Sequence, residues 1–420
     1  MKHAIYGLGL CYALAGCVDH HAAITGTQSL GVELVTPMDP GDIDHRLPDG
    51  QRTITVNLTA YDAAFAVDPT FERDVEVYAQ FLGTVTPTPT LDGLSKLVAT
   101  PLATFHLTAG KVMNQTVTLP VVFGPTTLWI EDGPKPISPS NRKIDPGYHP
   151  TYVTGASPTL WFRDPFIADI QTPIIQVPND LLTALVDSPL ENKQITVNSS
   201  RYGDAGRLVV TSVFSQGYTV SDVKCSDASG TPPCAAAAYD HVEVFSFSAP
   251  ADQNGRLLKQ GQLIDGFSGG ISEFNGLTEI GFPGTTASSS AVTPDHLPAP
   301  VKFDSAWFGP LTDPQGLGMI NFERNEAAAI EIDNAAVCML DKDYATFNQW
   351  KLDPSGVGGD CSSNNNVINV VTAGVIAALD PATLVGKTLP RVVGVLRPVE
   401  FGSFNVWIIY PRSAADLTLQ

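Results

Sequence analysis

Short apolar runs that alternate with polar residues are the dominant pattern of this chain from residue 30 onward. Residues 53–59 alternate strictly, and similar runs recur as far as residues 159–162. Alternate side chains of a strand point to opposite faces, so this spacing predicts a series of short strands, each with one buried face. We expect residues 30–175 to form an immunoglobulin-like β-sandwich, with Trp129 and Trp161 as large core residues.

A weak internal repeat organises the second half of the chain. A Gly-x7-Gly frame occurs at Gly261 and Gly269, and again at Gly386 and Gly394. Each frame leads into an apolar strand and then into a second strand that ends at a proline, and further alternating runs precede each frame. Strands in this arrangement, interrupted by glycine where a sheet must coil, are typical of a small closed barrel.

The end of the second repeat resembles a known family. Residues 386–394 and 404–416, which close on the sequence YPRSAAD, are similar to the end of bacterial extracellular OB-fold domains. The first repeat resembles these domains less closely, because it lacks the Arg-Ser-x-x-Asp ending. The resemblance implies one OB-like barrel at residues 185–290 and another at 311–420, with 291–310 as a linker. It implies an architecture and no single activity, because OB barrels bind many kinds of ligand.

Composition agrees with a mostly β protein. Hydrophobic residues make up 43% of the 420 residues and charged residues only 16%, so the chain can build buried cores. The 33 prolines and 36 glycines fit short strands joined by turns. The predicted fold class is therefore an N-terminal immunoglobulin-like β-sandwich followed by two OB-like β-barrels.

The chain is strongly acidic, with a formal net charge of −19. A phosphate backbone would be repelled by this average charge, so a nucleic-acid partner is not favoured. The simpler interpretation is that the acidity maintains solubility.

The first residues resemble a bacterial lipoprotein signal peptide. A basic start and an apolar stretch too short to span a bilayer lead to Leu14-Ala15-Gly16-Cys17. The resemblance implies removal of residues 1–16, acylation of Cys17 and attachment to a lipid bilayer, with residues 17–29 as a tether. Val18 is not acidic, so analogy with enteric lipoproteins favours the outer membrane or cell surface of a Gram-negative bacterium.

The cysteines suggest disulfides. Of six cysteines, Cys11 lies in the expected signal and Cys17 would carry lipid, which leaves an even number in an exported chain. Proximity favours the pairs Cys225–Cys234 and Cys338–Cys361. A zinc site is the alternative, but no closely spaced pair of Cys or His residues accompanies these cysteines.

Two further motifs suggest a catalytic or metal site, but each also has a simpler structural explanation. Residues 266–270 match the G-x-S-x-G nucleophile elbow around Ser268, but another strand is expected directly after them and no histidine follows His296. Carboxylates cluster at residues 39–44 and at Asp341 and Asp343 without the full spacing of a calcium loop. We therefore expect solvated acidic turns, with weak calcium binding as the alternative, and no other cofactor.

Aromatic residues are the candidates for a ligand face. OB barrels bind ligands on their middle strands and flanking loops, where aromatic rings stack on bases or sugars. We expect such a face at Tyr218 in the first barrel and at Tyr344, Phe347 and Trp350 in the second. Phe245 and Phe247 share one face of a predicted strand and are expected in the core. The long loop at residues 131–158 is either a binding loop or an irregular insertion.

These features favour a non-catalytic, lipid-anchored protein of the cell envelope. It would display binding or structural β modules to a protein or carbohydrate partner. One alternative is an OB-fold binder of single-stranded nucleic acid or polysaccharide, although basic residues are few. The other is a hydrolase that uses Ser268.

Overall fold

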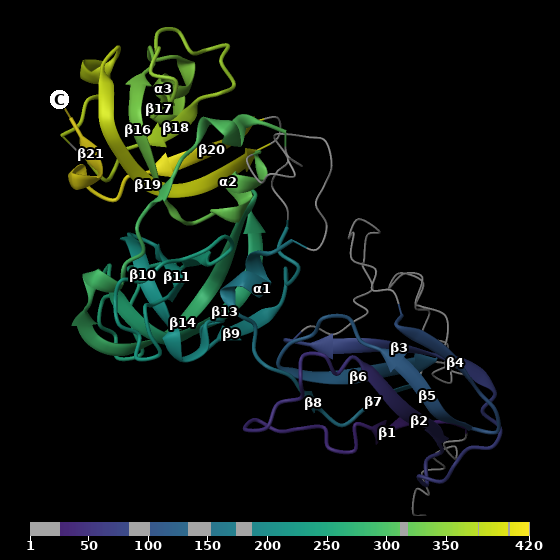
Figure 1. The fold of residues 1–420 in the computed structure, drawn as a ribbon. Coiled ribbons are helices and arrows are strands. Elements are labelled where there is room, and N and C mark those ends of the chain that lie inside the picture. The colour runs from purple at the N-terminus through teal and green to yellow at the C-terminus, as the bar shows by residue number, and fades with distance from the viewer. Residues whose placement is uncertain are drawn as a thin grey trace, which may run out of the picture.

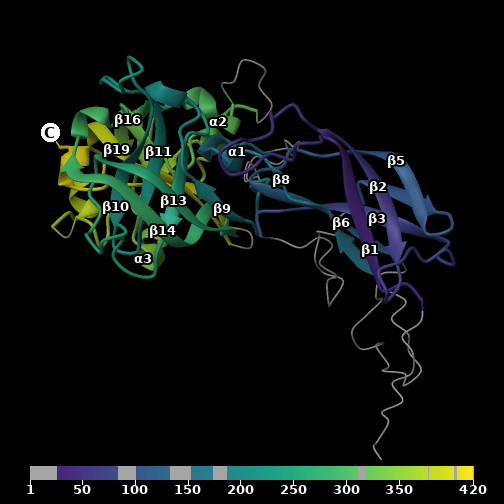
Figure 2. The same ribbon diagram turned by 90° about the horizontal axis from the view of Figure 1, so that it is seen from below.

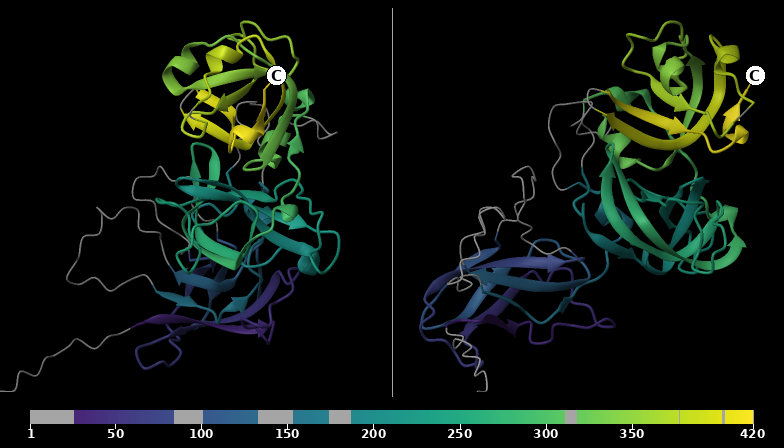
Figure 3. Two further views of the ribbon diagram at one scale, coloured as in Figure 1. Left: turned by 90° about the vertical axis from the view of Figure 1, so that its left-hand side faces the viewer. Right: turned by 180° about the vertical axis from the view of Figure 1, so that it is seen from behind.

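The computed structural model describes residues 26–83, 101–132, 153–173, 187–310, 318–376, 378–401 and 404–419. Within these residues the chain is mostly β and forms a sandwich and two barrels, as the alternating pattern predicts. In Figure 1 the first barrel lies between the sandwich and the second barrel, and Figure 3 shows the same order from two other sides. The expected signal peptide, most of the tether and most of the loop at residues 131–158 lie outside the described residues.

The sandwich consists of two antiparallel sheets with one shared core. The first sheet has the order β1-β2-β5, and the second has the order β4-β3-β6-β7 with β8 also paired to β6. These sheets enclose a cluster of aliphatic side chains that includes Ile54, Val77 and Ile130. A sheet of β1, β2 and β5 thus faces a sheet of β3, β4, β6 and β7, which is an immunoglobulin-like arrangement. The strand bounds are β1 (Ser29–Thr36), β2 (Thr53–Tyr61), β3 (Arg73–Phe81), β4 (Ala103–Leu107), β5 (Lys111–Thr118), β6 (Pro125–Asp132), β7 (Thr154–Ala156) and β8 (Leu160–Trp161).

The expectation that Trp129 and Trp161 fill the sandwich core is wrong. Their neighbours Leu128, Ile130 and Leu160 are the buried residues, and both tryptophans are only half-buried. Because side chains of a strand alternate between faces, an error of one position moves a residue from the core to the outside.

The two barrels repeat one topology. The first has the strand order β10-β11-β12-β14-β13 and closes by pairing β13 with β10. The second has the order β16-β17-β18-β20-β19 and closes by pairing β19 with β16. In each barrel the third and fifth strands are the parallel pair. This is the five-stranded Greek-key barrel of the OB-fold.

The barrel strands cover most of the second half of the chain. The bounds are β9 (Gln194–Val197), β10 (Gly206–Phe214), β11 (Gly217–Lys224), β12 (His241–Phe245), β13 (Gln262–Phe274), β14 (Leu277–Val292), β15 (Val301–Lys302), β16 (Ala329–Val337), β17 (Gln349–Asp353), β18 (Ile368–Val371), β19 (Thr388–Phe401), β20 (Phe404–Tyr410) and β21 (Leu417–Thr418). Strand β14 extends into the expected linker at 291–310, and β15 within that linker pairs with β16 of the second barrel. The segment between the barrels is therefore partly built into them.

The Gly-x7-Gly frames mark the fourth strand of each barrel. Gly261 and Gly386 precede β13 and β19 with positive φ values of 81° and 75°, which glycine adopts without strain. A Cβ atom on Gly269 would lie 2.6 Å from the oxygen of Gly281. A Cβ atom on Gly394 would lie 2.8 Å from the carbonyl carbon of Tyr410. The second glycine of each frame thus allows the fourth and fifth strands to approach closely.

Short helices connect the modules. Helix α1 (Ile167–Gln171) follows the sandwich strands, but Ile167 and Ile170 belong to the core of the first barrel. Helix α1 therefore packs with the first barrel, although it falls within the range expected for the sandwich. The other helical segments are η3 (Gly203–Ala205), η4 (Pro294–His296), η5 (Ser305–Phe308), α2 (Ile320–Arg324), α3 (Lys342–Phe347), η6 (Pro381–Leu384) and η7 (Ala414–Asp416). In Figure 2 both α1 and α2 lie on the side of the barrels that faces the sandwich.

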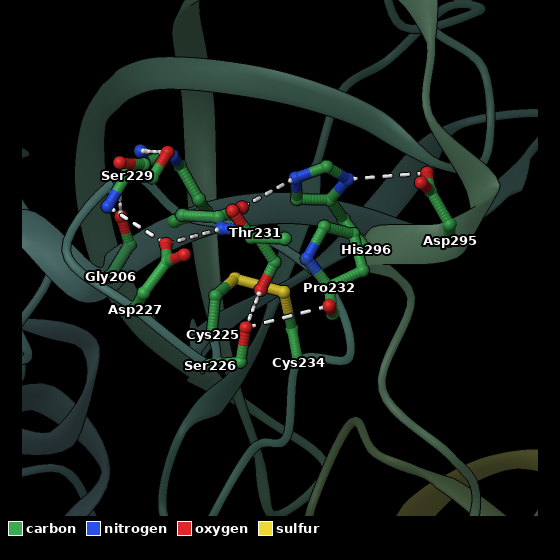
Figure 4. Close-up of a disulfide and its surroundings, with 12 residues drawn as sticks. Gly206, Cys225, Ser226, Asp227, Ser229, Thr231, Pro232, Cys234, Asp295 and His296 are labelled. Atoms are coloured by element: carbon green, nitrogen blue, oxygen red, sulfur yellow. Dashed lines mark hydrogen bonds and ion pairs between the residues drawn. A yellow bond between two sulfur atoms is a disulfide. The ribbon is translucent and has the colours of Figure 1, made fainter.

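Both expected disulfides are present. Cys225 is bonded to Cys234 in the loop between β11 and β12, as Figure 4 shows. Cys338 is bonded to Cys361 and ties the end of β16 to the loop between β17 and β18. The RSAAD ending also has a structural role, because Arg412 donates two side-chain hydrogen bonds to Asp416, at 2.9 and 2.7 Å.

Candidate functional site

Two of the four residues expected on a ligand face are core residues, so that prediction is wrong for them. Tyr218 is fully buried in the first barrel, where its hydroxyl group lies 2.7 Å from Oγ1 of Thr285. Trp350 is 1% exposed and points into the core of the second barrel from strand β17, which the sequence pattern did not reveal. Tyr344 is half-buried at the edge of this core, and Phe347 at the end of α3 is 57% exposed.

The outer face of β11 and β12 is not open to solvent. Val220, Val242 and Val244 point into the first barrel, so the residues between them point outward. These outward residues are nevertheless buried: Thr219, Ser221, His241 and Glu243. We call them the β11–β12 outer face. In an OB-fold this face commonly meets ligands, and here the second barrel covers it.

A small cavity between the barrels borders the β11–β12 outer face. Thr211, Ser221, Ala236 and His241 of the first barrel line it. The other lining residues come from the segment between the barrels and from the second barrel: Leu297, Pro298, Ala299, Val301, Ala329 and Arg412. Nδ1 of His241 lies 2.7 Å from Oγ of Ser221, and Nε2 has no partner among the described residues. Burial lowers the pKa of His241 to about 4, so its imidazole is neutral at ordinary pH.

A buried ion pair joins the barrels beside this cavity. Arg397 on β19 donates a hydrogen bond to the fully buried carboxylate of Glu243 on β12. Burial raises the pKa of Glu243 to about 7, although Arg397 opposes the shift. The guanidinium group of Arg397 also lies over two rings, 5.3 Å from the centre of Phe214 and 5.2 Å from that of Tyr410. Such a pair fixes the relative position of the barrels, because removing either partner would leave a buried charge alone.

Phenylalanine side chains gather where β12 ends. The ring centre of Phe247 lies 5.1 Å from that of Phe245 and 5.0 Å from that of Phe282 on β14. The ring of Phe214 lies over Gly217, which is the cross-strand partner of Phe245. Phe247 is 65% exposed and Phe282 is 81% exposed. We call Phe214, Phe245, Phe247 and Phe282 the phenylalanine surface.

The phenylalanine surface overturns the expectation that Phe247 is a core residue. Strand β12 ends at Phe245, so the alternation of faces no longer applies two residues later. Phe282 has a positive φ of 52°, in a region that side chains other than glycine rarely adopt. Backbone strain of this kind is a reason to suspect function where it presents an exposed ring.

The segment around Ser268 does not form a nucleophile elbow. Ser268 lies within β13, with Gly284 of β14 on one side and Thr196 of β9 on the other. An elbow instead needs a tight turn between a strand and a helix, which pushes the serine out toward a histidine. The hydrolase hypothesis thus lacks its expected structural context.

The acidic clusters and the cysteines already have partners. The carboxylate of Asp42 accepts hydrogen bonds from the backbone nitrogens of Asp44 and His45, whereas Asp341 and Asp343 pair with Lys351 at 2.5 and 2.8 Å. The sulfur atoms of Cys225 and Cys234 lie within 4.8 Å of a ring nitrogen of His296. Figure 4 shows these sulfurs bonded to each other, so they offer no thiolate to a metal ion.

Sequence patterns alone did not reveal the covered β11–β12 outer face or the phenylalanine surface. The alternating run at residues 242–247 predicted a strand there, and the structure forms β12 over His241–Phe245. The covering of that face depends on the second barrel, which local alternation does not report. One feature of the sequence could have indicated that the ring of Phe282 is exposed. Phe282 comes directly before Pro283 and Gly284, where the strand pattern is irregular.

Comparisons with known proteins found no matching family model, no matching curated protein and no matching solved structure. None of the helices within the described residues has the length and apolar character needed to cross a bilayer. The functional argument therefore depends on this chain's own residues.

Proposed function

We propose that this protein is a non-catalytic, lipid-anchored component of a bacterial cell envelope that binds a protein partner through its phenylalanine surface. The exposed rings of Phe247 and Phe282 are the observation that carries the proposal. Two disulfides agree with an oxidising location outside the cytoplasm. The resemblance of residues 14–17 to a lipoprotein signal supports attachment through acylated Cys17, in the outer membrane or at the cell surface.

The chemistry of the phenylalanine surface favours a protein over a carbohydrate. Sugars are usually held by aromatic rings together with side chains that hydrogen-bond hydroxyl groups, and this surface consists of phenylalanine residues, whose side chains have no polar atom. A second copy of the chain is also a poor occupant. The net charge of −19 would oppose self-association.

We therefore expect a partner with apolar side chains that insert between the rings and with basic groups around them. Charge complementarity with an acidic protein would accelerate binding more than it would tighten it. The single-stranded nucleic acid alternative loses support, because the usual OB ligand face of the first barrel is covered by the second barrel.

The lipid anchor is tested by metabolic labelling. In cells that process lipoproteins, the wild-type chain should incorporate labelled palmitate, and Cys17→Ala should abolish the label, because the acylated atoms belong to that residue. Cys11→Ala is the matched control and should retain the label. Equal labelling of wild type and Cys17→Ala would exclude the proposed anchor.

The partner surface is tested by site-specific photocrosslinking in intact cells. With p-benzoylphenylalanine in place of Phe247, illumination should give a larger adduct that a protease degrades. The same group in place of Phe274, which is 61% exposed at the end of β13, is the matched control and should give none. Adding Phe282→Gly should reduce the yield at position 247, since it removes one of the two strongly exposed rings. An adduct that resists proteases but is cut by glycosidases, or equal yields at both positions, would contradict a protein partner at this surface.

A further inference from the structure

The barrels and helix α1 meet at a buried carboxyl group that the proposed binding surface does not use. Glu326, which follows α2, is 3% exposed. Its Oε1 accepts a hydrogen bond from Nε2 of Gln171 at 3.3 Å and another from the backbone nitrogen of Thr278 on β14 at 3.1 Å. Nε2 of Gln171, at the end of α1, also donates to the carbonyl oxygen of His241 on β12 at 2.7 Å. Glu326 thus connects α1, the first barrel and the second barrel.

The groups that face Glu326 are acidic. Burial is the largest cause that raises the pKa of Glu326, and the carboxylates of Glu323 on α2 and Glu273 on β13 raise it further. Oε1 of Glu273 accepts hydrogen bonds from the nitrogen of Ser188 and from Oγ1 of Thr278, both at 2.8 Å. Burial and the nearby Asp187 and Glu191 raise the pKa of Glu273 to about 7.

We call the contact of Glu326 with α1 and the first barrel the joint. The basic groups around the joint have other partners. Arg397 on β19 pairs with Glu243, and Arg201 pairs with Asp240 at 2.8 Å. Arg324 at the end of α2 hydrogen-bonds Tyr239. Burial raises the pKa of the Tyr239 hydroxyl group, and Arg324 opposes this shift. His241 is neutral at ordinary pH for the reason given above. Among the residues that the structure describes, no salt bridge joins a cation to Glu326.

We propose that Glu326 is a proton-dependent lock between the two barrels: its protonated carboxyl group holds α1, β14 and the second barrel together, and its ionisation loosens the second barrel. A neutral carboxyl group can be buried with its carbonyl oxygen accepting the hydrogen bonds from Gln171 and Thr278. These two bonds by themselves favour the ionised form, but burial and the neighbouring carboxylates outweigh them and raise the pKa of Glu326. A carboxylate in the same place would be buried beside other carboxylates, and no cation among the described residues forms a salt bridge with it, which is unfavourable. Separation of the barrels along this joint would admit water to the charged group, so acid favours the closed arrangement and alkali favours the loosened one.

The lock is tested on the full chain by small-angle X-ray scattering at about pH 5.5 and about pH 8.5. The wild-type radius of gyration should be larger at the higher pH. Glu326→Gln cannot ionise and keeps an oxygen that accepts both hydrogen bonds, so it should remain compact at both pH values. Glu331→Gln is the matched control. Glu331 is 9% exposed in the same barrel but pairs with Lys302 and Arg391, so this variant should keep the wild-type response.

A second measurement needs no variant. The amide of Thr278 donates to Glu326, so its hydrogen exchange, corrected for the intrinsic effect of pH, should accelerate at least about tenfold at the higher pH. A wild-type radius that does not change with pH, or a Thr278 amide that stays equally protected, would overturn the proposal. So would a pH response that persists in Glu326→Gln. Loss of the photocrosslinked partner would not affect this result, which separates the lock from the proposed binding function.

Discussion

At the scale of single residues, two exposed phenylalanines have the same unusual backbone. Phe282 on the first barrel and Phe65 on the sandwich have φ values of 52° and 58°, and they are 81% and 83% exposed. A left-handed conformation costs a residue other than glycine roughly 1–2 kcal/mol. Because both side chains are exposed, burial does not offset this cost at either position. Only Phe282 belongs to a cluster of rings, which makes Phe65 a natural control for it.

We predict that Phe282→Gly and Phe65→Gly each raise the free energy of unfolding by about 1 kcal/mol, because glycine adopts positive φ without strain. Urea unfolding of both variants beside the wild type measures the effect. Only Phe282→Gly should also weaken photocrosslinking at position 247. A loss of stability in Phe282→Gly alone would show that its ring contact with Phe247 outweighs the backbone strain, and the ring would then have a structural role.

At the scale of elements, local patterns predicted which segments form strands better than which of their faces are covered. The alternation and the glycine frames led to the sandwich and to two barrels, and cysteine proximity led to both disulfides. These features depend on residues that are close in sequence. Tyr218 and Trp350 were assigned to a surface although each side chain points into a barrel. Polar neighbours on a strand are uninformative there, since alternation places them on the opposite face.

The buried outer face of β12 shows most clearly that local patterns do not report which face of a strand is covered. A strand with the sequence HVEVF is expected to place histidine and glutamate in water. Here both are buried, because Arg397 and Gln171 arrive from segments more than 150 and about 70 positions away in the chain. No pattern within β12 carries that information. The candidate joint at Glu326 could not be predicted for the same reason, as its partners come from α1, β13 and β14.

At the scale of the whole molecule, the joint between the modules brings together groups whose pKa values shift in opposite directions. Burial raises the pKa of Glu243 and that of Glu273 from 4.5 to about 7, and it lowers the pKa of His241 from 6.5 to about 4. The folded state therefore holds the glutamate protons more tightly than the unfolded chain does, and holds the histidine proton less tightly. By linkage, the glutamates reduce stability as pH rises from 4.5 to about 7, whereas His241 reduces stability as pH falls from 6.5 to about 4.

Between pH 4.5 and 6.5 these contributions oppose each other, and above 6.5 the glutamates act alone. We predict that the free energy of unfolding, measured by urea titration, decreases as pH rises from about 6.5 to about 8. Glu243→Gln imitates the protonated side chain and should make this decrease smaller. Glu331→Gln again serves as control and should leave the slope as in the wild type. An unfolding free energy that rises over this interval would contradict the prediction, because it would mean that the ion pair with Arg397 keeps Glu243 ionised in the folded protein across this range.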